Sequence, residues 1–153
     1  MREILFHGKR LDNGEWVEGY YCTNPEWDRK TCGEHHWVIS CKNGMRYEVD
    51  PSTIGQFTGL TDKNGRRIFE GDILEYNDGV DYFKGVVVYE CGAFGIGFGK
   101  PMSIPNMCCD NFALLWQLYW DQEAPSEPEL YYCEVIGNIH DNPELLEEAN
   151  GTA

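Results

Sequence analysis

The sequence lacks the long apolar run that a membrane-spanning helix requires. No stretch of its 153 residues approaches about 20 consecutive apolar residues. The longest apolar neighbourhood, residues 112–120, is too short, and residues 1–7 lack the apolar core of a secretory signal. We therefore expect a cytoplasmic protein that has no contact with a membrane.

Basic residues are also scarce, and the C-terminal third has none. Residues 101–153 hold ten acids and no Lys or Arg, whereas residues 1–100 hold all 12 Lys and Arg beside 16 acids, for a net charge of −14. A surface that binds duplex DNA needs a basic footprint, and only Lys9-Arg10 and Arg66-Arg67 are locally basic. Direct binding of duplex nucleic acid is thus disfavoured. The acidic third indicates either a solubilising surface or one that engages a basic partner.

Paired cysteines of the kind that hold zinc are missing as well. None of the seven cysteines forms a Cys-x-x-Cys motif. Four ligands from Cys22, Cys32, His35 and Cys41 are conceivable, but their spacing lacks the tight pairs of zinc sites, and sequence does not show whether they converge. We expect free thiols that behave as small apolar groups, with no metal and no cofactor.

The common catalytic signatures are absent. The chain has no Gly-x-Ser-x-Gly elbow and no His-Glu-x-x-His motif, and the Gly-rich run at 92–99 lacks the Lys-Ser/Thr of a phosphate-binding loop. Asp72, which follows Gly71, is expected to bond nearby backbone amides at a bend. The sequence therefore predicts no catalytic residue, and a small hydrolase is the weakest hypothesis.

What the sequence does contain is a succession of short β patterns separated by Gly-containing turns. Asn43-Gly44 between two apolar runs is a strong hairpin signal, and Phe94, Ile96 and Phe98 alternate with glycines at the strand period of two. Strands are predicted at 3–7, 15–21, 37–40, 46–49, 53–60, 68–76 with a bend at Gly71, 82–90, 93–98 and 130–136. This pattern favours a mostly β protein built as a small barrel.

Two helices are expected beside the strands. Asp110 or Asn111 would cap a short helix over 112–120, and Asn142-Pro143 would start a final helix. An acidic loop follows the first helix at 121–129, and Gly137-Asn138 is expected to form a turn. We predict a single domain over 1–153, with an N-terminal β region at 1–60 that includes a hairpin extension, a barrel-like core at 61–140 and a C-terminal helix and tail at 141–153.

Three stretches resemble the YopX family of bacteriophage and prophage proteins. The opening carries Phe-His-Gly-Lys-Arg at 6–10 and Gly-Glu-Trp-Val-Glu-Gly-Tyr at 14–20; the centre spans 54–65 and 68–74; the close spans 134–146, from Glu-Val-Ile-Gly-Asn to Pro-Glu-Leu-Leu. The resemblance implies a barrel reminiscent of SH3 domains and the cytoplasm of a bacterial host, and it implies no activity. It covers neither residues 23–36 nor the Cys108-Cys109 pair.

Aromatic residues are plentiful in the first sixty positions. SH3-like barrels use exposed aromatics as a peptide groove, so we expect a non-enzymatic protein-binding or assembly module whose partner is unknown. The alternative for the aromatics is that they fill a small core. The alternative function is an acidic mimic of nucleic acid that occupies a DNA-binding protein. The helix over 112–120 is apolar on more than one side, which predicts a homo-oligomer. The expected interaction surface comprises Trp16, Tyr20, Trp37, Phe57, Leu114, Trp116 and Leu118.

Overall fold

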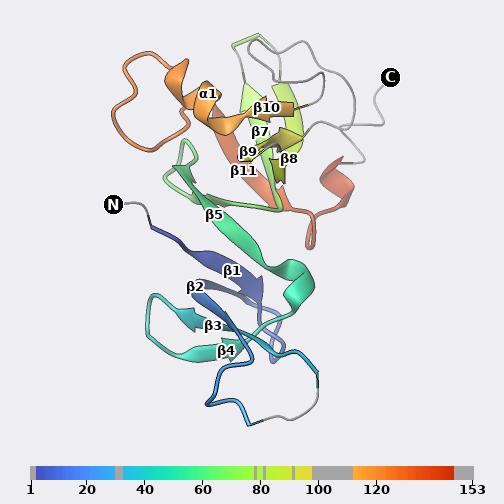
Figure 1. Ribbon diagram of the computed structural model, residues 1–153. Coiled ribbons are helices and arrows are strands. Elements are labelled where there is room, and N and C mark those ends of the chain that lie inside the picture. The colour runs from blue at the N-terminus through green and yellow to red at the C-terminus, as the bar shows by residue number, and fades with distance from the viewer. Residues whose placement is uncertain are drawn as a thin grey trace. The chain divides into compact units, whose positions relative to one another are not determined.

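The computed structural model divides into two compact units, Met1–Phe57 and Thr58–Ala153 (Figure 1). It describes residues 3–29, 33–77, 79–80, 82–90, 92–97 and 112–146. The boundary falls inside one strand, three residues before the division predicted between the N-terminal β region and the core. Whether the chain folds as the predicted single domain stays a prediction.

The first unit is an antiparallel sheet in the strand order β4-β3-β2-β1-β5. Its elements are β1 (Phe6–Lys9), β2 (Trp16–Thr23), β3 (His36–Ser40), β4 (Arg46–Glu48), the 3₁₀ helix η1 (Pro51–Thr53) and β5 (Gly55–Thr61). Both predicted hairpins are present, because Gly14 and Gly44 adopt the positive φ that their turns require. The register is fixed by pairs such as Gly8 with Val17 and Tyr20 with Ile39.

One face of this sheet carries a small apolar core. Val17, Val38 and Val49 are buried together, and Tyr47 and Ile54 pack against them. These side chains lie on one face because Tyr47 pairs with Val38 and alternate residues of a strand point to opposite faces. The other face is therefore left to the remaining alternate residues.

The second unit holds a sheet in the order β10-β9-β8-β7-β11. Its elements are β6 (Arg67–Phe69), which is hydrogen-bonded to β5, and then β7 (Asp72–Asn77), β8 (Tyr82–Glu90), β9 (Ala93–Gly97), β10 (Phe112–Leu114), α1 (Leu115–Trp120) and β11 (Cys133–Asn138). The core is largely aliphatic, and Leu74, Val87 and Ile96 are among its almost fully buried residues. The strand predicted at 68–76 is divided between β6 and β7 around Gly71, whose φ is 89°.

Two sequence predictions need correction in this unit. Residues 112–114 are not helical: they form β10, which pairs with β9, and the helix begins only at Leu115. Gly137-Asn138 is not a turn, because β11 continues through it after a shift of register between Val135 and Gly137. Both errors arise from strand partners that are distant in sequence, which local pattern does not reveal.

The mostly β class is confirmed, with all strand pairs antiparallel within the sheets. The strand orders are linear and the first and last strands of each order do not pair, so in the described ranges the sheets are open and no closed barrel is found. A helical turn at 144–146 begins the predicted final helix; the rest of that helix, and Cys108-Cys109, lie outside the described residues. No helix in the described part of the chain is long and apolar enough to cross a bilayer.

Candidate functional site

The register of the first unit brings three of the predicted surface aromatics to one face. Trp16 and Tyr20 are four residues apart in β2 and so point the same way. Tyr20 pairs with Ile39, and Trp37, two residues before Ile39, pairs with Cys22. Trp16, Tyr20 and Trp37 therefore lie on the face opposite the valine core, and Tyr20 is 57% exposed.

A fourth aromatic, Trp27, joins this face from a turn in the segment between β2 and β3. Its ring meets that of Trp37 edge-on, with centroids 4.7 Å apart and planes at 78°. The backbone amide of Asp28 donates to the carbonyl of Pro25, which holds the turn. Trp27 was missed by the sequence analysis because its segment is polar; a tryptophan among polar residues was the available signal. We call Trp16, Tyr20, Trp27 and Trp37 the aromatic face.

Charged groups lie directly against these rings. The Arg46 guanidinium stands over Trp27 at 4.4 Å from the ring centroid, and Lys9 Nζ is 6.0 Å from the centroid of Trp16. The indole Nε1 of Trp37 donates to Asp28 Oδ2 at 2.7 Å. The face thus combines apolar rings with cations and a carboxylate, which is the composition of many protein contact surfaces.

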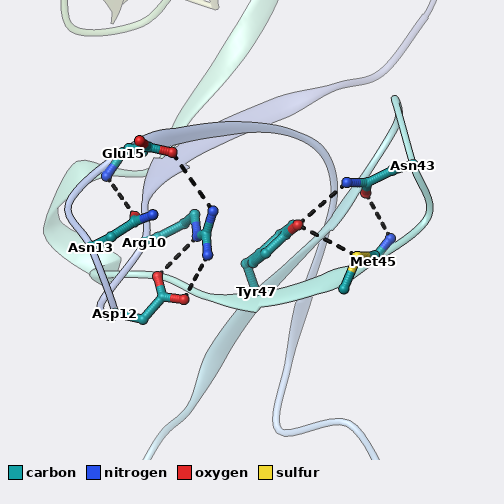
Figure 2. Close-up of polar contacts among 7 residues, drawn as sticks. All are labelled: Arg10, Asp12, Asn13, Glu15, Asn43, Met45 and Tyr47. Atoms are coloured by element: carbon teal, nitrogen blue, oxygen red, sulfur yellow. Dashed lines mark hydrogen bonds and ion pairs between the residues drawn. The ribbon is translucent and has the colours of Figure 1, made fainter.

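Figure 2 shows the polar contacts of Arg10 in the first hairpin and of Tyr47 on the edge strand β4. Arg10 donates two hydrogen bonds to Asp12, from Nε at 2.9 Å and from Nη2 at 2.6 Å, and its Nη1 lies 3.8 Å from Glu15. The same guanidinium stands 4.0 Å from the centroid of the Tyr47 ring. The hydrogen bond from Arg10 lowers the pKa of Asp12 and raises that of Arg10, so both groups stay charged.

The tip of the second hairpin is tied to the same tyrosine (Figure 2). Asn43 Nδ2 donates to the Tyr47 hydroxyl at 3.3 Å, and that hydroxyl points to the Met45 sulfur at 3.8 Å. Asn43 Oδ1 also accepts from the Met45 amide. Tyr47 packs against the valine core, and its neighbour Arg46 points to the opposite, aromatic face of the sheet.

Two histidine–glutamate pairs lie at the other end of the same strands. His35 Nδ1 is 2.9 Å from Glu48, His36 Nε2 is 3.4 Å from Glu34, and His36 Nδ1 contacts the Tyr21 hydroxyl. A metal site does not follow: among the described residues no three His, Cys, Asp or Glu side chains gather as a metal would need. Cys22 is half-buried and Cys41 exposed, while Cys32 falls outside the described ranges.

The remaining predicted surface residues are divided between the interior and the exterior. Phe57 and Leu118 are 9% and 8% exposed and belong to the interior, because strand and helix geometry turn them inward. Leu114 is half-buried at the end of β10. Trp116 is 51% exposed on α1, so it alone of the second-unit candidates presents a large surface.

The buried polar groups of the second unit hold turns together. Asp62 accepts from the amides of Asn64, Arg66 and Val135, each at 2.9 Å. Asp72 accepts from the Phe69 amide at 2.9 Å, as its place after Gly71 predicted. These carboxylates are used by the fold, which leaves the aromatic face as the candidate site.

Comparison with known proteins gives a family and a fold. The family model described as YopX protein matches residues 6–147, nearly the whole chain. The crystal structure of protein EF1440 from Enterococcus faecalis is similar with a TM-score of 0.50 and 24% identity, covering 95% of this chain and 99% of that one. At this identity the likeness shows the fold alone. No curated protein matches the chain.

Proposed function

The chain belongs to the YopX family, and from this premise we propose that it is a non-enzymatic protein-binding module whose contact surface is the aromatic face. The observation that carries the proposal is the shared orientation of Trp16, Tyr20 and Trp37, reinforced by Trp27. Tryptophan and tyrosine supply much of the binding energy at protein interfaces, because they bury large apolar areas while keeping a polar group.

Side-chain recognition is favoured over the addition of a partner strand. The outer edge of β11 is already occupied, since Asp62 accepts from the Val135 amide and the Lys63 amide donates to the Cys133 carbonyl. On the edge strand β4, the Glu48 carbonyl accepts from the Leu11 amide. At these positions β11 and β4 offer fewer backbone groups to an extended peptide.

A matched pair of tyrosines tests this proposal. Tyr20 on the aromatic face and Tyr89 on β8 are exposed to the same degree, at 57% and 56%. The wild-type chain, Tyr20→Ser and Tyr89→Ser are each used to capture proteins from a bacterial host extract, and the captured partner is quantified. We expect Tyr20→Ser to recover at least about fivefold less partner, as for an interface residue that contributes 1 kcal/mol or more, with Tyr89→Ser unchanged. Equal recovery by all three would contradict the proposal.

A second function is favoured by charge. Residues 58–153 hold 17 acids against 5 Lys and Arg, a net of −12, whereas residues 1–57 hold 9 against 7. We also consider that the second unit mimics nucleic acid and occupies a DNA-binding protein. In that case the captured partner is a DNA-binding protein that duplex DNA releases in competition. Failure of excess duplex DNA to release it would exclude mimicry.

A further inference from the structure

Resting on the proposed function, we infer that the aromatic face recognises an arginine side chain of its partner, and that Arg46 occupies the same ring until the partner arrives. The site is the corner formed by Trp27 and Trp37, with Asp28 at its side. The inference names the chemistry of the partner, a protein segment that presents arginine, and it predicts an exchange of one guanidinium for another.

The geometry of the corner suits a planar cation. Two indole rings meet edge-on at 78° with centroids 4.7 Å apart, so the ring of Trp27 is packed against that of Trp37. A guanidinium already occupies this position, because Arg46 Cζ is 4.4 Å from the centroid of Trp27. Arginine stacks on indole faces more readily than lysine, since its guanidinium is flat and weakly hydrated.

Arg46 is held there less firmly than the other stacked arginine of this unit. Arg10 on Tyr47 is fixed by two hydrogen bonds to Asp12. Arg46 is exposed, and in the described ranges its guanidinium forms no ion pair or hydrogen bond, so the ring of Trp27 is its contact. An exposed cation–π contact stabilises by a factor of about two to five in an equilibrium constant, which a competing arginine can match.

Charge complementarity favours a cationic partner. The whole chain has a net charge of −14, and residues 101–153 hold no Lys or Arg. The carboxylate of Asp28 accepts from the indole of Trp37, and Glu48 pairs with Trp37 in register and so shares its face. A cationic segment is thus drawn to the chain as a whole.

The test uses the full chain and a short acetylated peptide with two arginines separated by glycines. Binding is followed by nuclear magnetic resonance at the indole N–H of each tryptophan, and by the shift of the Arg46 side-chain N–H as it leaves the ring. The comparison peptides replace arginine with lysine or with uncharged citrulline. Far-ultraviolet circular dichroism checks that each protein variant is folded.

Three variants make the result specific. Arg46→Ala frees Trp27 and should tighten arginine-peptide binding about two- to fivefold, the factor lost with an exposed cation–π competitor. Lys42→Ala removes the same charge from the same hairpin without freeing the ring, and should change binding less than Arg46→Ala. Trp27→Phe keeps an aromatic ring with a weaker cation–π contact and should weaken binding, and Trp27→Ala should weaken it further.

Several outcomes would overturn the inference. The first is equal affinity for the arginine and citrulline peptides. The second is that the peptide shifts the indole N–H resonances of Trp116 and Trp120 only. The third is that Lys42→Ala tightens peptide binding as much as Arg46→Ala does. Self-association of Arg46→Ala beyond that of the wild-type chain at the same concentration, with no response to the peptide, would identify a second copy as the occupant and also overturn it. The arginine peptide could bind no better than the citrulline peptide while Tyr20→Ser still captures less partner than the wild type. That pair of results would overturn this inference and leave the proposed function standing, so the two failures are distinguishable.

Discussion

In the second unit, a single side chain accepts hydrogen bonds from backbone amides that have no acceptor in the sheet. Asp62 is almost fully buried, and its carboxylate accepts three amides, two from its own turn and one from β11. A buried amide that loses its acceptor costs about 1–3 kcal/mol. The resemblance to the family includes Asp62, and its contacts show that this part of the motif maintains the fold.

Replacing Asp62 by Ala should therefore lower the free energy of unfolding by about 3 kcal/mol, because three amides lose an acceptor. Urea denaturation measures the change, and Glu123→Ala, an exposed acidic residue of the same unit, is the control. We expect the control to stay within about 0.5 kcal/mol of the wild type. An Asp62→Ala chain as stable as Glu123→Ala would contradict this role.

The buried thiol of Cys133 makes the free energy of unfolding depend on pH in the alkaline range. Burial, and secondarily the nearby Asp62 carboxylate, raises the pKa of its thiol from 9.0 to about 12. The raised pKa means that the folded chain keeps a proton which the unfolded chain loses above pH 9. This contribution is fully present below pH 9 and is lost as pH rises toward 12.

Unfolding in urea at pH 8 and pH 10.5 checks this for the wild type and for Cys133→Ala. We expect the wild type to lose more stability between the two pH values than Cys133→Ala, since every other ionisable group is common to the two chains. Site-resolved alkylation adds a second readout, in which exposed Cys41 reacts first and Cys133 only after unfolding. Equal pH sensitivity of the two chains, or early alkylation of Cys133, would refute the assignment.

At the scale of elements, β9 and β10 meet through a glycine that leaves space for a ring. A Cβ on Gly95 would lie 2.3 Å from the Phe112 ring and 2.7 Å from the Ala113 carbonyl oxygen, whereas a Cβ on Gly97 would have its nearest neighbour at 3.4 Å. Distances below 3 Å force the strand or the ring to move. The two glycines of one strand thus differ sharply in what they tolerate.

Gly95→Ala should destabilise the chain by about 1–3 kcal/mol, the usual cost of overpacking, while Gly97→Ala should change stability by less than about 1 kcal/mol. Thermal unfolding of both variants beside the wild type measures the difference. The order of the two variants is the decisive observation. A Gly95→Ala chain at least as stable as Gly97→Ala would show that the β9–β10 contact is not as described.

The same scale shows what local sequence predicts and what it does not. The hairpins at Gly14 and Gly44 and the bend at Gly71 were predicted because their turn chemistry is contained in a few adjacent residues. β10 was predicted as a helix because its pairing with β9 depends on the space beside Gly95, far away in sequence. The aromatic face was predicted only in part, since Trp27 reaches Trp37 through a turn whose geometry no periodicity reveals.

At the scale of the whole molecule, the surface predicted to form a homo-oligomer contact lies on the second unit. Trp116 and Trp120 are 51% and 63% exposed and are one helical turn apart on α1, while Leu115 and Leu118 are buried. This narrows the predicted homo-oligomer contact from the whole segment 112–120 to two tryptophans. Oligomerisation itself stays a prediction.

Light scattering at micromolar concentration tests it. We expect a mass that rises above the 17.6 kDa of one chain toward twice that value, because exposed apolar patches usually mark interfaces. A chain with Trp116→Ser and Trp120→Ser should stay at the mass of one chain. A wild-type mass that remains 17.6 kDa at every concentration would remove the support for an oligomer.

The central claim is that the first unit recognises its partner through Trp16, Tyr20, Trp27 and Trp37. The most direct measurement is hydroxyl-radical footprinting of the chain alone and in complex with the partner captured from the host, read by mass spectrometry at each aromatic residue. We predict protection of Tyr20 and the three tryptophans of the first unit, with Trp116, Trp120 and Tyr89 unchanged. Protection confined to residues 58–153, with Tyr20 oxidised as fast as in the free chain, would contradict the account.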